Sequence, residues 1–342
     1  MRFPVALGLG ALAVLASVTL AVTIGPADLG AAEVWRSIGA HLGHLFGTVE
    51  DPAAGLGPLR DAVVWELRLP RVLTAAFVGA GLAVAGAVMQ SLTRNPLADP
   101  YLLGLSSGAS LGAVAVLLLG AAVLLPVAAF AGALLALVAA LWLAGAGGPL
   151  TPARMVLAGV AVSQAAAAAT SFVIVWSATG DSYREVLSWL LGSVAGADWG
   201  SVGIAAAAVV VVGVALAANA GTLDAFAFGD TAASALGVDV ARTRWTLLTA
   251  TALLVGALVA VSGSIGFLGL VVPHGVRLVV GPGHRRVLPL SVLVGAVVLV
   301  WADTLARSAF APREVPVGIV TALIGAPVFA ALLWRRGAGA AR

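Results

Sequence analysis

The stretch ELRLPRVLTAAFVGAGLAVAGAVMQSLTRNPLADPYLLGLSSGASLGA, residues Glu66–Ala113, decides the fold of this chain. It opens with two arginines, Arg68 and Arg71, and continues through an apolar run to a polar segment at 90–100, after which a second apolar run begins. A helix needs roughly 20 apolar residues to cross the hydrocarbon core of a bilayer. The stretch therefore predicts one helix across lipid, a structured turn and a second helix that returns.

The composition extends this pattern to the whole chain. Of its 342 residues 61% are hydrophobic and 10% are charged, whereas a soluble domain carries about 25% charged residues. A transmembrane β-barrel would show short alternating segments in place of long apolar runs. The chain is therefore predicted to be an all-α, polytopic membrane protein with about ten transmembrane helices. We expect these spans at 3–24, 70–92, 102–120, 122–144, 153–177, 199–219, 244–264, 265–281, 287–307 and 316–335.

An internal repeat divides the predicted domain, which covers 1–342, into halves at about 66–180 and 240–336. Gly79–Gly86 matches Gly256–Gly263 at an offset of 177, with five of eight residues identical, and the same offset places Pro96 on Pro273. Five spans separate the copies, so the halves are expected to cross the membrane in opposite directions, as inverted repeats of transporters do. The alternative to a repeat is a chance match in a sequence rich in Ala, Gly and Val.

The arginines predict the orientation. With the N-terminus inside, 11 of the 18 arginines fall on the inner side, in keeping with the positive-inside rule. The run 3–24 is longer than the apolar core of a signal peptide. We therefore expect it to be retained as the first helix, with both termini in the cytoplasm, although cleavage is the alternative.

Charges near membrane depth are few. Asp303 and Arg307 are four residues apart on one predicted helix and can neutralise each other. Arg68, Arg71 and Arg307 are all expected at the outer surface, where they could bind acidic groups of a partner or anchor the chain in lipid headgroups. His41 and His44 lie in an outer loop without a third ligand nearby, so solvated side chains are favoured over a metal site.

Small and polar residues suggest packing and a possible gate. Gly79, Ala83 and Gly86 share one helix face, as do Gly104, Gly108 and Gly112, and small residues let helices approach closely in lipid. The polar turn at 90–100 could line the inner mouth of a pathway or be a simple turn. A short inner helix is expected from Asp230 to Leu236, stopped by Gly237.

Several classes of site are absent from the sequence. It has no Cys, no Gly-rich phosphate loop with a Lys and no motif of paired catalytic groups. The centres of the spans are nearly free of charge, unlike those of proton-coupled carriers. The chain is therefore expected to be a non-enzymatic subunit without a cofactor or metal of its own, driven by energy released on another chain.

Four motifs that occur in order resemble the FecCD family, the permease subunits of type II ABC importers for ferric siderophores, haem and cobalamin. They are RLPR (68–71), NPLADP (95–100), GLVVPH (269–274) and VPVG (315–318). The resemblance implies a dimer of permease subunits, expected to be a homodimer, two cytoplasmic ATPases that bind ATP and Mg, and an extracytoplasmic substrate-binding protein. Nucleic acid is not expected as a partner.

The resemblance also implies roles for residues. It assigns Arg68, Arg71 and Arg307 to docking of the binding protein. The inner loop at about 220–242 resembles the coupling helices that contact the ATPase, through Phe228, Gly229, Asp230, Thr231, Ala232, Ala233, Ser234, Ala235, Leu236 and Gly237. The gate region is matched by Asn95, Pro96, Leu97, Thr151, Pro152 and Ala153, although some relatives carry small hydroxyl residues where this chain has Pro152 and Ala153.

We therefore expect import of an iron–siderophore-type chelate by alternating access, across the cytoplasmic membrane of a bacterium. The pathway is expected to be largely apolar and lined by the third, fifth and eighth spans. Haem and cobalamin are alternative substrates. A self-sufficient secondary carrier is the alternative from another class, and uptake that persists with an inactive ATPase but stops with a protonophore would distinguish it.

Overall fold

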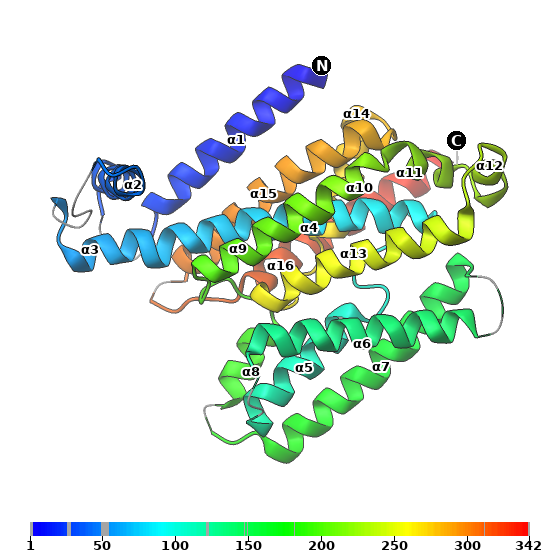
Figure 1. The fold of residues 1–342 in the computed structure, drawn as a ribbon, viewed down its shortest axis with the longest axis horizontal. Coiled ribbons are helices and arrows are strands. Elements are labelled where there is room, and N and C mark those ends of the chain that lie inside the picture. The colour runs from blue at the N-terminus through cyan, green and yellow to red at the C-terminus, as the bar shows by residue number, and fades with distance from the viewer. Residues whose placement is uncertain are drawn as a thin grey trace.

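The computed structural model describes residues 3–25, 29–48, 55–120, 123–146, 148, 150–180, 182–310 and 312–340, and helices form nearly all of the regular structure there (Figure 1). In chain order the helices are α1 (Phe3–Thr23), α2 (Ala31–Leu45), α3 (Pro58–Ala62), the π-helical segment η2 (Val63–Arg68), α4 (Leu69–Leu92), α5 (Leu105–Leu119), α6 (Leu125–Gly145), α7 (Pro152–Ser177), α8 (Ser182–Leu190), α9 (Trp199–Ala208), the π-helical segment η3 (Val209–Gly213), α10 (Val214–Ala218), α11 (Ala220–Ala227), α12 (Asp230–Ala235), α13 (Val240–Ser262), α14 (Leu268–Val280), α15 (His284–Ser308) and α16 (Val317–Ala340).

The prediction of an all-α polytopic fold is confirmed. Among the described residues, seven helical stretches are long and apolar enough to cross a membrane, and three shorter apolar helices, α5, α14 and the first part of α16, correspond to the remaining predicted spans. The sixth predicted span consists of α9, η3 and α10 in series. Most boundaries shift by only a few residues, whereas the second span belongs to a continuous helical stretch that begins at Pro58.

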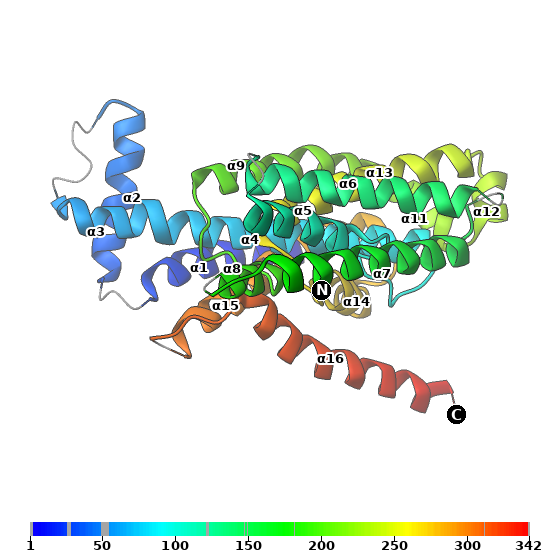
Figure 2. The ribbon, with the colours of Figure 1, turned by 90° about the horizontal axis from the view of Figure 1, so that it is seen from below.

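Helix α4 is the centre of the bundle. It is buried along almost its entire length, between α1, α9, α13, α14 and α15. Helices α5, α6 and α7 form a second group, which joins the first mainly through α6 and α13 (Figure 1). Helix α16 leaves α15 and diverges from the bundle toward the C-terminus (Figure 2).

The glycines of the opening stretch make the closest helix contacts. A Cβ added at Gly79 would lie 2.2 Å from the carbonyl oxygen of Gly295 in α15, and one at Gly86 would lie 1.8 Å from the carbonyl oxygen of Gly269 in α14. The face predicted from Gly79, Ala83 and Gly86 is therefore shared between two neighbouring helices. Without a hydrophobic driving force in lipid, such close backbone approach is a main source of helix association.

The repeat at offset 177 does not correspond to equal local structure. Gly86 lies inside α4, whereas Gly263 ends α13 with a positive φ of 63°. Pro96 lies in a connection and Pro273 lies inside α14. The opposite orientation of the two halves stays a prediction.

Candidate docking and coupling sites

Two of the predicted docking arginines bind the C-terminal end of α1. Arg68 donates from Nη1 to the carbonyl oxygens of Val22 and Thr23, each at 3.2 Å, and Arg307 donates from Nη2 to that of Ala21 at 2.6 Å. The last carbonyls of a helix lack partners within the helix, and a positive charge there also complements the helix dipole. These arginines therefore hold the end of α1 against α4 and α15.

The third arginine is the centre of a buried ionic cluster. Arg71 binds both carboxylate oxygens of Asp303 at 3.0–3.1 Å and donates to Glu314 at 2.7 Å. Arg307 approaches Asp303 from one helical turn away, with Nε 3.8 Å from Oδ2, so the predicted pairing of these two residues is confirmed. Asp303 is only 1% exposed, whereas the side chain of Glu314 is 40% exposed.

We expected all three arginines to face the outer surface, and the structure corrects that expectation. Arg68, Arg71 and Arg307 are 5%, 8% and 3% exposed, because the chain itself supplies their acceptors. Their role in docking a partner stays a prediction. The contact between Arg71 and Glu314 is partly open to solvent.

The inner loop folds into two short helices, α11 and α12, which we call the coupling unit together with Phe228, Gly229, Leu236 and Gly237. The predicted helix from Asp230 is confirmed as α12, and Gly237 follows it with a φ of 82°. Sequence reasoning missed α11, whose Leu223 and Phe226 are buried. The separation of these two apolar residues by three positions was the feature of the sequence that could have indicated a helix.

Arg244 in the first turns of α13 holds the coupling unit. Its guanidinium binds Asp230 of α12 at 2.6 Å, donates to the carbonyl oxygen of Leu150 at 2.7 Å and lies 5.3 Å from the ring centroid of Phe226. The residue is 3% exposed. Sequence reasoning did not single out Arg244, because Leu150 is 94 positions away and nothing local shows which residues of the preceding loop it contacts.

Two more contacts attach α11 to the central bundle. Ser91 at the end of α4 donates to the carbonyl oxygen of Leu223 at 2.7 Å, and Asp224 binds both the backbone N–H and Nδ1 of His284 at the start of α15. The coupling unit therefore contacts α4, α13 and α15 at once. A displacement of the unit would reach three spans.

The coupling unit has two large apolar side chains that are exposed. Phe228 is 81% exposed and Leu236 is 71% exposed, at the two ends of α12. Ala233, between them, is buried. The unit thus combines a firm attachment to the bundle with two projecting apolar side chains.

Both predicted gate segments border the coupling unit. Arg94, beside Asn95, lies close to Gly229, since a Cβ added at that glycine would be 3.2 Å from its Nη1. Leu150, next to Thr151, accepts the hydrogen bond from Arg244.

Each gate segment has a local structural role. The side chain of Asn95 accepts from the backbone N–H of Leu97 at 3.0 Å, with Pro96 between them. The hydroxyl of Thr151 accepts from the backbone N–H of Arg154, and Pro152 and Ala153 open α7. Proline is favoured at the first helical position, which explains its presence there. A gating role for these residues stays a prediction.

A polar contact that the sequence did not predict joins α4 to α14. Gln90 donates to the carbonyl oxygen of Leu270 at 3.1 Å and binds Arg277, which also donates to the carbonyl oxygen of Ala87. Tyr101 donates to the carbonyl oxygen of Ile265 at 3.0 Å. The polar turn that opens at Gln90 is therefore anchored to the second half of the chain.

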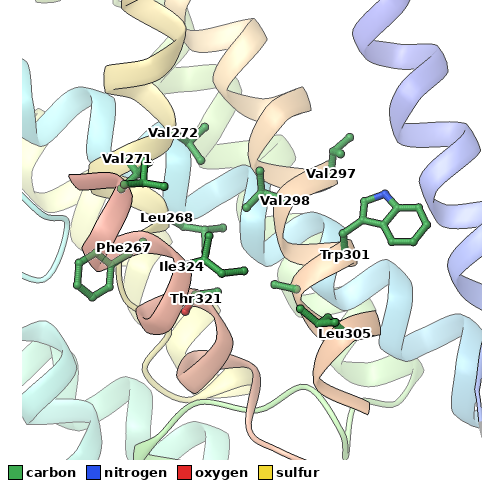
Figure 3. Close-up of a pocket in the computed structure, with 13 residues that line it drawn as sticks. Phe267, Leu268, Val271, Val272, Val297, Val298, Trp301, Leu305, Thr321 and Ile324 are labelled. Carbon is green, nitrogen blue, oxygen red and sulfur yellow. The ribbon is translucent and has the colours of Figure 1, made fainter. Parts of the chain in front are cut away.

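An apolar cavity with a volume of about 440 Å³ lies between α14, α15 and α16. Its walls come from Leu268 and Val272 on one side and from Val298, Trp301 and Leu305 on the other (Figure 3). The indole of Trp301 donates to Ser17 of α1 at 3.0 Å. Helix α14 is the eighth predicted span, whereas the third and fifth contribute no residue to this cavity, so the lining of a pathway by these three spans stays a prediction.

The outer-loop histidines do not form a metal site in the described part of the chain, where no group of three His, Asp or Glu residues could hold an ion. His41 is not the solvated residue that the sequence favoured. It is half-buried, lies 2.7 Å from Asp61 and stacks on Trp65.

Known proteins resemble this chain along most of its length. The model of the FecCD transport family matches residues 12–335. The chain is 46% identical over 281 residues to the cobalamin import system permease protein BtuC of Halobacterium salinarum, covering 82% of this chain and 75% of that protein. It is 42% identical over 280 residues to the Fe(3+)-citrate import system permease protein YfmD of Bacillus subtilis, covering 80% and 81%. A solved inward-facing ABC transporter of the metal-chelate type superposes with a TM-score of 0.84 at 30% identity, over 97% of this chain and 99% of the other.

Proposed function

The chain belongs to the FecCD transport family, and from that membership we propose that it is the permease subunit of an ABC importer for a metal chelate. It has no catalytic site of its own in this proposal. ATP and Mg are bound and ATP is hydrolysed by two partner ATPases on the cytoplasmic side. The described residues carry no feature that would replace such a partner.

The observation that carries the proposal is the coupling unit. Exposed apolar side chains cost free energy in water unless a partner covers them, and Phe228 and Leu236 project from a segment that is bound to three spans. A groove on an ATPase that covers these two side chains would displace α12. Arg244 and Ser91 would then pass that displacement to α13 and α4.

A second copy of the chain is the proposed partner within the membrane. Helix α7 has 26 residues, and in its most apolar 18-residue segment only 17% of the residues are buried. Many of its side chains are small, which would allow another helix to approach closely. A homodimer would cover such a helix and enclose an apolar pathway between the copies. The N- and C-termini lie in the cytoplasm in this arrangement.

An extracytoplasmic binding protein is the proposed partner at the opposite face. Arg71 is the arginine best suited to it, because its contact with Glu314 is partly open to solvent. A carboxylate from the partner would replace Glu314 on Arg71, while Asp303 would stay bound. Arg68 and Arg307 would support this exchange by keeping α1 in place.

Two cargoes fit the comparisons. Cobalamin import and ferric citrate import are the named activities of relatives that are 46% and 42% identical. An iron–siderophore-type chelate is our first candidate and cobalamin is the second, with haem as a further member of the class. All are bulky chelates that an apolar, weakly binding pathway can pass.

Uptake by cells that lack and then regain this gene tests the proposal. We expect restored uptake of either radiolabelled ferric siderophore or radiolabelled cobalamin, lost again when the partner ATPase cannot hydrolyse ATP and unaffected at first by a protonophore. Uptake that survives ATPase inactivation but stops with the protonophore would contradict the proposal and support a secondary carrier.

A further inference from the structure

One face of helix α2 is fixed to the rest of the chain by buried contacts. Ser37 donates to one carboxylate oxygen of Asp61 at 2.6 Å, and Nε2 of His41 lies 2.7 Å from the other. The His41 ring stacks on Trp65 with centroids 4.1 Å apart and 2° between the planes. Val34 on the same face is fully buried. The orientation of α2 about its own axis is therefore defined.

A second face of α2 is apolar and exposed. At about 100° per residue, Trp35, Leu42 and Phe46 fall within a sector of about 40°, and they are 48%, 47% and 82% exposed. We call these three residues the apolar stripe. The remaining arc carries Glu33, which pairs with Arg60, and the exposed Arg36.

The position of α2 in the bundle relates this stripe to the membrane. The helix lies across the direction of the spans, seen end-on in Figure 1 and upright in Figure 2, at the end where α1 finishes. Trp65, on which His41 stacks, lies 4.8 Å from Trp199 at the start of α9. Tryptophans gather where transmembrane helices leave the hydrocarbon, so the pair marks the level of the interface at which α2 lies.

We infer that α2 is an interfacial helix whose apolar stripe inserts among the lipids of the outer leaflet. A helix parallel to the membrane plane, with aromatic and Leu residues on one face and charges on another, is the pattern of such helices. The stripe contains no charge and only one hydrogen-bonding group, the Trp35 indole. The neighbouring helix α1 also carries exposed apolar side chains, with Leu12, Leu15 and Leu20 each more than half exposed.

Lipid is favoured over a protein as the occupant. A docking protein that arrives from water would leave the stripe exposed for as long as it is absent, whereas lipid is always present at the level of the tryptophan pair. The inference depends on the chain crossing the membrane and is independent of the cargo.

Single labelled cysteines test the inference in the full-length chain, which has no native Cys. Leu42→Cys and Trp35→Cys report on the stripe, and Arg36→Cys is the matched control on the polar face of the same helix. Each variant carries an environment-sensitive fluorophore in phosphatidylcholine nanodiscs. A thermal unfolding midpoint close to that of wild type first shows that each variant is folded. Emission is then quenched either by lipid spin-labelled near the headgroup or by aqueous iodide.

We expect both stripe labels to be quenched several-fold more by the lipid quencher, relative to iodide, than the Arg36 label, and to emit at shorter wavelength. An equal or smaller ratio at the stripe would overturn the inference. Protection from both quenchers would overturn it as well, because it would show that protein covers the stripe. Two stripe positions are used so that the loss of one variant to misfolding leaves the other to decide.

Discussion

Replacing Gly86 by Ala tests the close packing of α4 on α14. The added Cβ would lie 1.8 Å from the Gly269 carbonyl oxygen and 2.4 Å from its carbonyl carbon. Reaching even the shortest tolerable contact would require a movement of about 1.2 Å, and because the obstacle is backbone, no side chain can rotate away. The two helices must therefore separate.

The expected magnitude combines two opposing effects. Overpacking of a well-packed contact costs about 3 kcal/mol or more when the surroundings cannot relax, while Ala in place of Gly inside a helix favours folding by about 1 kcal/mol. The net result is a destabilisation of about 2 kcal/mol or more. The contacts of Gln90 with Leu270 and Arg277 lie one turn away and should weaken with it.

Gly8→Ala in α1 is the matched control, because a Cβ there meets nothing within 4 Å. Thermal unfolding followed by tryptophan fluorescence in one detergent should give a midpoint for Gly86→Ala several degrees below wild type. The Gly8→Ala midpoint should equal or exceed that of wild type. Equal midpoints for the two variants would refute the proposed contact between α4 and α14.

Three further predictions concern single groups. Arg71→Leu should destabilise the chain by about 3 kcal/mol, because the buried Asp303 loses its contact with Arg71 through both carboxylate oxygens and keeps only Arg307, 3.8 Å away. Adding Asp303→Leu should recover part of the loss; thermal unfolding of both variants measures this, and additive losses would exclude the pairing. Burial raises the pKa of Asp99, in the connection after α4, to about 6. Between the ordinary pKa of an aspartate and this raised value, the carboxyl group is protonated in the folded state and ionised in the unfolded state. Stability should consequently fall as pH rises between about 4 and about 6. Asp99→Asn should remove this decrease from a plot of the thermal unfolding midpoint against pH, whereas an unchanged decrease would assign it to another group. Phe228→Ser should leave the free energy of unfolding within about 0.5 kcal/mol of wild type but reduce transport by the assembled importer at least several-fold. Normal uptake would contradict a role for this side chain in coupling.

The sequence was sufficient for the elements whose signals are local. Length and apolar content located the membrane-crossing helices, and an acid followed by a glycine located α12. The spacing of Gly79 and Gly86 also predicted close packing, since an absent side chain has the same effect wherever the neighbouring helix lies.

Long-range partners were beyond the sequence. Arg71 and Asp303 are 232 positions apart, and although Asp303 has a local partner in Arg307, nothing near Arg71 shows that it has a buried counterion. An arginine at the end of a span has the same local sequence whether it faces water or caps another helix. For that reason the three arginines were predicted at the surface, and Arg244 was not recognised as the residue that holds the coupling unit.

The capping of α1 has a consequence for the order in which the chain assembles. Arg68 follows α1 after fewer than 50 residues, so its contacts with Val22 can form early in synthesis. Arg307 and Trp301 reach Ala21 and Ser17 across separations of 286 and 284 residues. Helix α1 therefore waits for α15 before its docking is complete, and until then only one of its two arginine caps can be in place.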